Sequence, residues 1–306
     1  MKTIPLGKSG MQVPTPAVGC MRLCNLDAKA AEHFIATAVE EGAVFFDHAD
    51  IYGGGACEEI FARAIHMNAA VRENIFLQSK CGIRPGVCYD LSKDYILKSV
   101  DGSLKRLNTE YLDVLLLHRP DALTEPEEVA QAFEILHSSG KVRHFGVSNQ
   151  NPMQMQLLQK FVKQPLAANQ LQLSPTNATM ISQGLHVNML SADAVSRDGS
   201  VLDFCRLHDI TVQVWSPFQY GTFDGTYLGN EKFPELNRVI REIGEKYALS
   251  DTAVVMAWLL RHPAKMQPIV GTTNEGRLRD CIRAAEITLS REEWYKIYLA
   301  AGNTLP

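Results

Sequence analysis

Short apolar runs alternate with amphipathic segments along the whole chain. The apolar runs predict eight strands, at about 16–19, 43–47, 75–79, 112–117, 144–148, 168–172, 211–215 and 268–270. Runs such as DVLLLH and TVQVW are apolar at successive positions, as expected for strands that are covered on both faces. Because strands and helices alternate, the sheet should be parallel, and eight repeats favour a closed (β/α)₈ TIM barrel within the α/β class.

Helical patterns fill the intervals between these runs. Three of them follow a side chain that commonly caps a helix: segment 28–42 after Asp27, segment 93–108 after Ser92, and segment 251–262 after Ser250. In the first of these, Gly42 provides the stop. A doubly wound open sheet is the chief alternative, but its GxGxxG fingerprint is missing after the first strand, which reads VGCMRL.

The remaining segments complete the predicted architecture. Residues 2–14 place two apolar runs around Gly-Lys-Ser-Gly, which predicts a β-hairpin that caps the barrel rather than joining it. The longest irregular stretches, 174–198 and 216–234, follow the sixth and seventh strands and should overhang the active face. No linker or low-complexity tract interrupts the chain, so we expect one domain over residues 1–306.

Composition narrows the class of protein. The 306 residues are 46% hydrophobic and 21% charged, which is typical of a globular domain. The formal net charge of −4 argues against nucleic acid or an anionic membrane as a partner. Seven scattered cysteines without a CxxC pair indicate reduced thiols, and no targeting or membrane-spanning segment is evident. We therefore expect a cytoplasmic protein; nothing in the sequence indicates its oligomeric state.

Polar side chains stand at the ends of the predicted strands, where barrel enzymes place their chemistry. Strand two ends at Asp47, strand three at Lys80 and strand four at His118. Asp47 alone also fits a helix cap and His118 a structural histidine, whereas a buried lysine is costly unless it is paired. His48, Asp50 and His118 lack the spacing of a metal site, so no metal is predicted.

Tyr52 lies five residues after Asp47, beside a run of three glycines that we interpret as backbone freedom around the tyrosine. A phenol next to a lysinium has a lowered pKa, a carboxylate holds the lysine in place, and a histidine N–H orients a carbonyl oxygen. Asp47, Tyr52, Lys80 and His118 thus suit the reduction of a carbonyl group, with Tyr52 as the proton donor. Since no side chain supplies a hydride, a nicotinamide cofactor is implied.

The motifs FFDHADIYG, LQSK, DVLLLHRPD and KVRHFGVSN resemble those of the aldo-keto reductase superfamily over essentially the whole chain. The layout resembles bacterial general oxidoreductases and, more distantly, potassium-channel β-subunits. The likeness implies that Ser148, Asn149 and Gln170 bind the nicotinamide carboxamide and that Trp215 stacks under the ring. It further implies pyrophosphate contacts at Ser216 and Phe218, and contacts to the 2′-phosphate of NADPH at Thr272 and Arg277. Gly19, Cys20, Asp47 and Gly271 complete the predicted cofactor-binding set.

Three departures from the family pattern shape the remaining expectations. Gly271 stands where several members carry a phosphate-binding lysine, which leaves Arg277 as the main cation and weakens the preference for NADPH. NADP(H) is still preferred, and NAD(H) is also possible. Met21 replaces a frequent tryptophan, and His48 a frequent Ser or Thr; with Tyr52 and His118 they form the predicted pocket for a small carbonyl substrate. The flexible Met21 favours broad tolerance of aldehydes or ketones. An NADPH-binding redox-sensing or regulatory subunit with little turnover is the alternative function.

Overall fold

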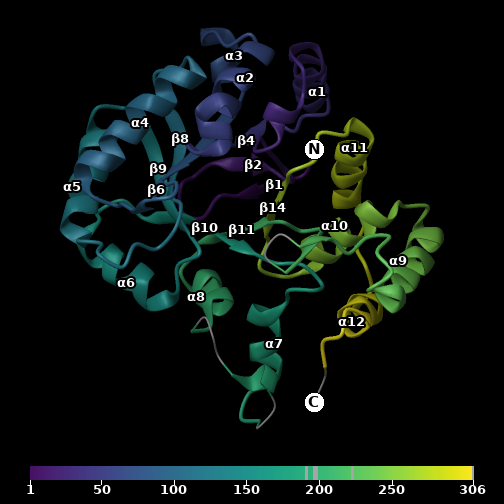
Figure 1. Ribbon diagram of the computed structural model, residues 1–306. Helices are drawn as coiled ribbons and strands as arrows, with labels where there is room; N and C mark the ends of the chain where they lie inside the picture. The colour runs from purple at the N-terminus through teal and green to yellow at the C-terminus, as the bar shows by residue number, and fades with distance from the viewer. Residues whose placement is uncertain (190–191, 196–198, 222–223, 305–306) are drawn as a thin grey trace.

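Eight parallel strands close a barrel at the centre of the molecule (Figure 1). The computed structural model describes residues 1–189, 192–195, 199–221 and 224–304. The barrel strands are β3 Ala17–Gly19, β4 Phe45–Asp47, β5 Phe76–Cys81, β8 Leu112–Leu117, β9 Val142–Ser148, β10 Leu166–Gln172, β11 Thr211–Trp215 and β14 Gln267–Val270. They follow one another around the barrel in chain order, and β14 pairs with β3 to close it. The predicted (β/α)₈ fold and all eight strands are confirmed.

Helices surround the barrel on its outside (Figure 1). They are α1 Ala28–Glu40, α2 Ala56–Ala64, α3 Ala69–Glu73, α4 Lys93–Leu107, α5 Pro126–Ser138, α6 Pro152–Phe161, α7 Thr179–Leu185, α8 Val201–Leu207, α9 Pro234–Tyr247, α10 Asp251–Arg261, α11 Glu275–Arg283 and α12 Arg291–Ala300, with 3₁₀ turns η1 Leu23–Asn25, η2 Tyr52–Gly55, η3 Ala192–Ala194 and η4 Ala284–Glu286. Asp27, Ser92 and Ser250 each accept a hydrogen bond from a backbone N–H in the first turn of α1, α4 and α10. The three predicted helix starts are therefore confirmed.

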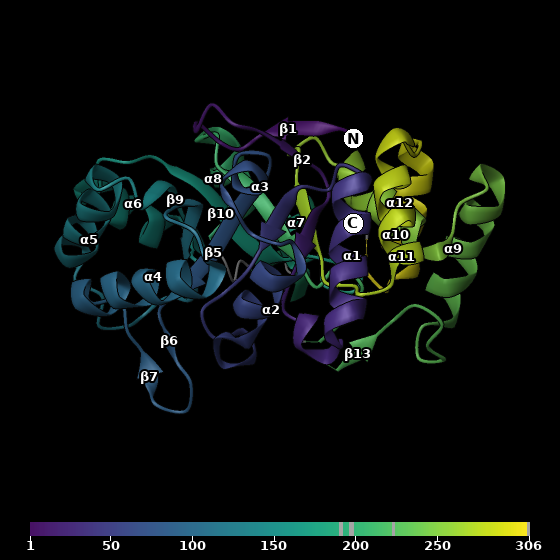
Figure 2. The same ribbon diagram turned by 90° about the horizontal axis from the view of Figure 1, so that it is seen from above.

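The N-terminal hairpin closes one end of the barrel. Strands β1 Thr3–Pro5 and β2 Gln12–Pro14 pair in antiparallel fashion outside the barrel sheet. Leu6 and Val13 are fully buried among residues that fill the barrel interior, and the backbone N–H of Gly7 donates to Thr211 Oγ1 at 2.7 Å. The hairpin is a cap, as predicted. Figure 2 shows it at the end of the barrel opposite β7 and β13.

Two short ribbons stand at the opposite end, where the barrel strands terminate. One pairs β6 Ile83–Arg84 with β7 Cys88–Tyr89, and the other pairs β12 Gln219–Tyr220 with β13 Gly225–Thr226. Irregular structure was expected throughout 174–198 and 216–234, and for the described residues this is wrong. The first stretch contains α7 and η3; α7 lacks a side-chain cap that would have marked it. Residues 190–191, 196–198 and 222–223 of these stretches, and 305–306 of the predicted domain, lie outside the described residues.

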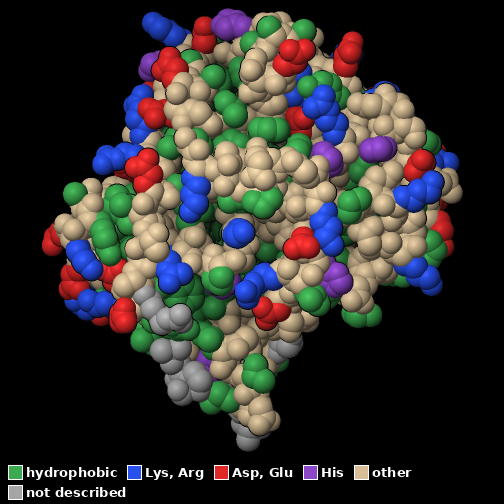
Figure 3. Space-filling view, turned by 180° about the vertical axis from the view of Figure 1, so that it is seen from behind, with side chains coloured by type: hydrophobic (Ala, Val, Ile, Leu, Met, Phe, Trp, Pro, Cys, Tyr) green, Lys and Arg blue, Asp and Glu red, His purple; other side chains and the backbone are tan. Residues whose placement is uncertain are grey.

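The molecular surface carries charges of both signs. Along the edge of the face in Figure 3, Lys and Arg side chains are interspersed with Asp and Glu. This distribution agrees with the small net charge of −4. Within the described residues, no helix combines the length and the apolar character needed to cross a bilayer.

Candidate active site

Asp47, Lys80 and Tyr52 meet at the end of the barrel where β4 and β5 terminate. Lys80 Nζ donates to Asp47 Oδ2 at 2.9 Å, to the backbone oxygen of His48 at 2.6 Å, and to the Tyr52 hydroxyl at 3.1 Å. The Lys80 side chain is fully buried and that of Asp47 is 3% exposed. An ammonium has three donors, so each proton of Lys80 has one acceptor. The predicted Asp-Lys pair thus forms, and it points its third proton at the tyrosine.

Burial and charge act in opposite directions on this pair of side chains. Burial disfavours the charged form of Lys80, but Asp47 and Tyr52 together outweigh it and raise the pKa of the lysine. For Tyr52, burial and the charge of Asp47 raise the pKa, Lys80 lowers it, and the net shift is upward. Lys80 itself lowers the pKa of Tyr52, as expected. The prediction that Tyr52 has a lowered pKa is nevertheless wrong, because the net shift of all contributions is upward. Lys80 is charged and Tyr52 is a neutral phenol at neutral pH.

His118 faces Tyr52 from the residue after β8. The two ring centroids lie 6.1 Å apart with the planes at 83°. Burial, together with the charges of Lys80 and Arg119, lowers the pKa of His118 to about 2. The imidazole is thus neutral, and its Nδ1 atom is buried without a hydrogen-bond partner in the described part of the chain. The structure brings all four residues predicted for catalysis into one cluster.

His48 does not line an open pocket. Its side chain is fully buried, and its ring packs edge-on against Phe61 of α2 at a centroid distance of 4.6 Å. Burial and the charge of Lys80 lower its pKa to about 3. Residues 47 and 48 point to opposite sides of the strand end, so Asp47 faces the barrel and His48 the helical layer. We correct the predicted pocket accordingly and leave His48 out of it.

A chain of glutamines supports Asp47 from inside the barrel, and our sequence analysis missed most of it. Gln78 Nε2 donates to Asp47 Oδ1 at 2.6 Å and to Gln213 Oε1 at 2.8 Å. Gln213 donates in turn to Gln267, whose amide reaches the backbone oxygen of Pro14 in the hairpin. These amides are fully buried and satisfy one another. A glutamine inside an otherwise apolar strand, as in FLQSKC, TVQVW and QPIV, was the available signal.

The three glycines after Tyr52 form the 3₁₀ turn η2. Gly53, Gly54 and Gly55 all have positive φ, at 59°, 65° and 99°. Such angles are unfavourable for residues with a Cβ, and at Gly55 a Cβ would also lie 2.8 Å from Arg106 Cδ. The run supplies backbone freedom beside the tyrosine, as interpreted from the sequence.

Three predicted carboxamide and stacking residues adjoin one another at the ends of β9 and β11. Asn149 Nδ2 donates to Ser148 Oγ at 2.8 Å, and Ser148 Oγ donates to the backbone oxygen of Gln170 at 2.9 Å. The half-buried Trp215 donates from Nε1 to Asn149 Oδ1 at 3.3 Å. The Gln170 side chain turns inward, because its Nε2 donates to Asp47 Oδ1 at 3.1 Å and to Gln213 Oε1 at 3.2 Å. Gln170 thus couples this group to the Asp47 cluster.

The residues predicted for the phosphates lie on loops after β11 and β14. Ser216 Oγ donates to Gln219 Oε1 at 2.6 Å, and the backbone oxygen of Phe218 accepts from the N–H of Tyr227. Thr272 Oγ1 accepts from the N–H of Asn274, which caps α11. The structure also places the side chain of Arg22 beside this loop, where Nη1 donates to the backbone oxygen of Gly271 at 2.9 Å. No local pattern in the sequence indicates that contact.

Arg277 projects from the first turn of α11. Its side chain is exposed and has no salt bridge with any described residue, whereas the neighbouring Arg279 bridges Glu41 and Glu275. An exposed guanidinium without an acidic partner is free to bind an anion. The chemistry at this position fits the predicted phosphate contact.

The segment after β3 contributes the remaining predicted residues. Gly19 packs against β14, where a Cβ would lie 3.1 Å from Ile269 Cγ2. The N–H of Cys20 donates to the backbone oxygen of Asp47 at 2.9 Å, and the Cys20 side chain is fully buried. Cys20 thus reaches the site through its backbone. Met21, in contrast, is 40% exposed.

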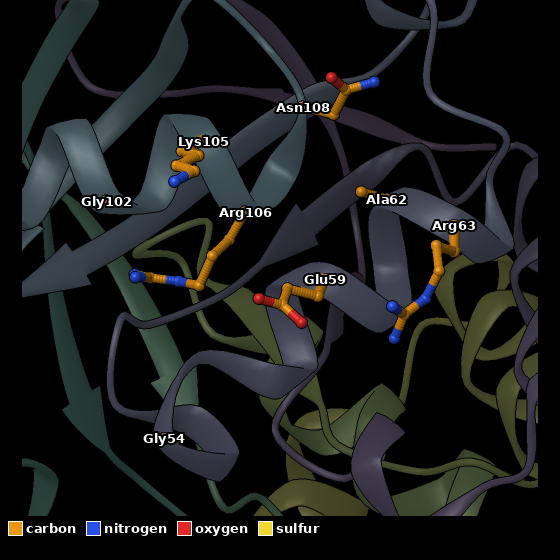
Figure 4. A pocket seen from close by; sticks show the side chains of 8 residues that line it. All are labelled: Gly54, Glu59, Ala62, Arg63, Gly102, Lys105, Arg106 and Asn108. Carbon is orange, nitrogen blue, oxygen red and sulfur yellow. The ribbon is translucent and has the colours of Figure 1, made fainter.

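A cavity of about 670 Å³ lies outside the barrel between α2 and α4 (Figure 4). Glu59 and Arg63 line it from α2, and Lys105 and Arg106 from α4. None of the predicted site residues borders it, so the candidate site is defined by the strand ends and not by this cavity. The described residues contain no cluster of three or more His, Cys, Asp or Glu side chains that is arranged to bind a metal ion.

Comparison with known proteins identifies the family. The model of the aldo/keto reductase family matches residues 17–299. The chain belongs to this family. As an aldo/keto reductase it is an oxidoreductase that acts on carbonyl compounds, and the family uses nicotinamide nucleotides as cofactors. The family resemblance stated from the motifs is therefore confirmed.

Individual aldo/keto reductases and their relatives match over nearly the full length. An uncharacterized oxidoreductase of Bacillus subtilis, YcsN, is 39% identical, and the match covers 94% of each chain. A probable voltage-gated potassium channel subunit beta of Arabidopsis thaliana is 27% identical over 92% of this chain and 90% of its own. The crystal structure of a thermostable aldo-keto reductase, Tm1743, in complex with the inhibitor epalrestat has a TM-score of 0.77 and 26% identity. That match covers 98% of this chain and 100% of the other.

Proposed function

We propose that this aldo/keto reductase reduces aldehydes or ketones to alcohols with hydride from NADPH and a proton from Tyr52. The observation that carries the proposal is the 3.1 Å hydrogen bond from Lys80 Nζ to the Tyr52 hydroxyl, in a lysine that Asp47 holds in place. This arrangement puts a positive charge beside the atom that becomes negative when Tyr52 gives up its proton.

Tyr52 and His118 share the work at the carbonyl oxygen in this proposal. Because its pKa is raised, Tyr52 holds its proton at neutral pH and is ready to donate it in the direction of reduction. Lys80 then stabilises the tyrosinate. His118 is neutral and donates one N–H to the same oxygen, which orients the substrate without adding a second charge.

The donor set at the barrel mouth supports a nicotinamide cofactor. Ser148 and Asn149 place a hydroxyl and an amide next to the half-buried ring of Trp215, which suits a carboxamide attached to a flat heterocycle. When bound, the nicotinamide supplies the hydride. Ser148 and Asn149 would fix the carboxamide, and Trp215 would hold the ring by stacking.

NADPH is favoured over NADH by the exposed Arg277. Its guanidinium lacks a salt bridge within the described residues and lies on the first turn of α11, next to the loop that carries Gly271 and Thr272. The 2′-phosphate of NADPH at this position gains a charge-assisted contact that NADH, which lacks this phosphate, cannot make. The proposal also includes contacts of Ser216 and Phe218 with the pyrophosphate of the cofactor.

The substrate is a small carbonyl compound that enters between Met21, Tyr52 and His118. The exposed thioether of Met21 adapts to substrates of different shape, which supports broad tolerance. We place all of these functions in the single domain over residues 1–306. The alternative, a regulatory subunit that binds NADPH but turns over little, agrees with the potassium-channel relative, whereas the complete Asp47, Tyr52, Lys80 and His118 cluster favours turnover.

Replacing Tyr52 by Phe tests the proposal most directly. The substitution removes only the hydroxyl, so kcat should fall by about 10²–10⁴-fold while the Kd of NADPH stays nearly unchanged. Steady-state reduction of a panel of aldehydes and ketones, with NADPH titrated by fluorescence, measures both. Tyr247→Phe on the outer helix α9 is the matched control. Near-full activity of Tyr52→Phe would show that another group donates the proton, and wild-type enzyme that turns over none of the panel would favour the regulatory subunit.

A further inference from the structure

Two cysteines lie side by side beneath the loop that carries Tyr52. Cys24 belongs to the turn η1 after β3, and Cys57 belongs to the first turn of α2. Their sulfur atoms approach the same backbone oxygen, that of Met21, at 3.7 Å for Cys24 and 3.3 Å for Cys57. Two segments that are 33 positions apart in the sequence therefore bring their thiols to one carbonyl group.

The glycine after Tyr52 lies directly against both sulfur atoms. A Cβ at Gly53 would lie 3.3 Å from Cys24 Sγ and 3.4 Å from Cys57 Sγ. Burial, and after it the neighbouring Cys24, raise the pKa of Cys57 to about 11. Both thiols thus adjoin the turn that positions the proposed proton donor.

The two thiols differ in their access to solvent. Cys24 is exposed and Cys57 is fully buried. Of the other five cysteines only Cys88 is exposed, and it lies on β7 in a separate two-stranded ribbon. A small oxidant in solution therefore reaches Cys24 directly, whereas Cys57 stays protected and protonated behind it. The proposed reduction chemistry uses neither side chain.

We propose that Cys24 and Cys57 are a site of reversible disulfide formation, with a hydroperoxide as the oxidant. The Cys24 thiol gives up its proton and its sulfur attacks one peroxide oxygen. The O–O bond breaks, that proton passes to the departing oxygen, and Cys24 becomes a sulfenic acid while water or an alcohol leaves. The sulfur of Cys57 then attacks the Cys24 sulfur, its proton passes to the departing hydroxyl, and water leaves as the S–O bond breaks. The two thiols together supply the two electrons that reduce the peroxide.

The bond would connect the two segments that frame the substrate pocket. It ties η1 to α2 across Gly53, and it removes both S–H groups that contact the carbonyl oxygen of Met21. Since Met21 and Tyr52 line the pocket in the proposed function, on which this consequence rests, oxidation should raise the KM for the carbonyl substrate. Apart from Gly19 and Cys20, the proposed NADPH residues lie on other loops, so the Kd of NADPH should change less than KM.

Peptide mapping of the full-length protein tests the disulfide without reference to catalysis. The protein is treated with hydrogen peroxide, its remaining thiols are alkylated, and it is digested without reductant. We expect a cross-linked peptide pair that contains Cys24 and Cys57, lighter by two hydrogens than the separate peptides and absent after dithiothreitol. Oxidation of Cys24 without this cross-link, or a cross-link of Cys24 to another cysteine, would overturn the proposal.

Three serine variants assign the steps. Cys57→Ser should stop at a sulfenic acid on Cys24, which dimedone traps, and Cys24→Ser should leave Cys57 reduced. Cys88→Ser, which removes the other exposed thiol, should form the cross-link as fast as the wild type. Equal oxidation of Cys57 in the presence and absence of Cys24 would contradict the order of the two steps.

The kinetic consequence is measured on the same oxidised sample. The KM of the carbonyl substrate should rise several-fold and return after dithiothreitol, whereas the Cys24→Ser enzyme should not respond to peroxide. If the cross-link forms and KM stays constant, the pocket consequence is wrong and the disulfide site stands. If no carbonyl compound is reduced at all, the proposed function fails, and peptide mapping still decides on the disulfide.

Discussion

Two buried ion pairs lie at opposite ends of the barrel, and they differ in what completes them. Asp113, near the start of β8, binds Arg72 at 2.7 Å, with both side chains at most 5% exposed. The remaining Arg72 donors go to the backbone oxygens of Ile75 and Tyr111 and to Thr109 Oγ1. At the other end, Lys80 pairs with Asp47 and donates its third N–H to the phenol hydroxyl of Tyr52.

The difference separates a structural ion pair from one suited to chemistry. Around Arg72 every partner is fixed, and Asp113 also accepts the backbone N–H of Leu77 and a bond from Arg143. Around Lys80 the third partner, Tyr52, is a group that can lose a proton. A buried charge becomes useful for catalysis when one of its partners is titratable and borders the substrate.

Breaking the structural pair should have the largest effect on stability. Asp113→Ala leaves Arg72 buried without its carboxylate, which should cost about 3–5 kcal/mol of unfolding free energy. The activity of the molecules that remain folded should be nearly that of the wild type. Chemical denaturation and kcat on the same preparation measure both quantities. As a control, Asp101→Ala removes the exposed pair with Lys141 and should cost no more than about 1 kcal/mol; equal losses for the two variants would contradict the assignment.

Breaking the Asp47–Lys80 pair should cost less stability and more activity than breaking the Asp113–Arg72 pair. In Lys80→Met, Asp47 keeps the hydrogen bonds from Gln78 and Gln170, so the loss of stability should be smaller than for Asp113→Ala. Tyr52 loses the charge that stabilises its anion, and kcat should fall by at least about 10²-fold. Denaturation curves and single-turnover rates compare the two variants. An unchanged rate in folded Lys80→Met would separate the lysine from proton transfer.

The Lys80 end of the barrel should also be sensitive to acid. The folded-state pKa of His48 is lowered to about 3 and that of His118 to about 2, so below their usual pKa only the unfolded chain binds these protons. This stability is present above pH 6.5 and is lost as the pH falls, by about 2 kcal/mol per histidine between pH 6.5 and 5. His48→Leu should remove the contribution of His48 and leave that of His118. Urea unfolding across this range measures it; parallel pH profiles for wild type and His48→Leu would refute the assignment.

Unlike Arg72 and Lys80, Arg277 has no salt bridge with any residue that the structure describes. Arg277→Ala should weaken NADPH binding by about tenfold, equal to about 1.4 kcal/mol, and leave NADH binding unchanged. Arg279→Ala on the same helix is the control, because Arg279 is already paired with Glu41 and Glu275. Fluorescence titrations with both nucleotides measure the difference. A similar loss for NADH would mean that Arg277 does not contact the 2′-phosphate.

The order of residues along the chain was enough to predict the barrel. Each strand shows apolar continuity and several helices show a capping residue, and both signals are local. In a parallel barrel all strands end at one face, so Asp47, Lys80 and His118 had to converge once the fold was right. The spacing between Asp47 and Tyr52 is local as well. For that reason the four-residue cluster was accessible from the sequence.

Contacts between distant segments were decided by the tertiary structure alone. The direction of the His48 side chain, the glutamine chain from Asp47 to Pro14, and the Arg22 contact with Gly271 depend on packing that no local pattern encodes. The sign of the pKa shift of Tyr52 is of the same kind, because it is set by the balance between burial and the opposing charges of Lys80 and Asp47. Cys24 in η1 and Cys57 in α2 approach the same backbone oxygen only because the closed barrel brings their segments together. Sequence determined which groups are available, and the fold determined which of them touch.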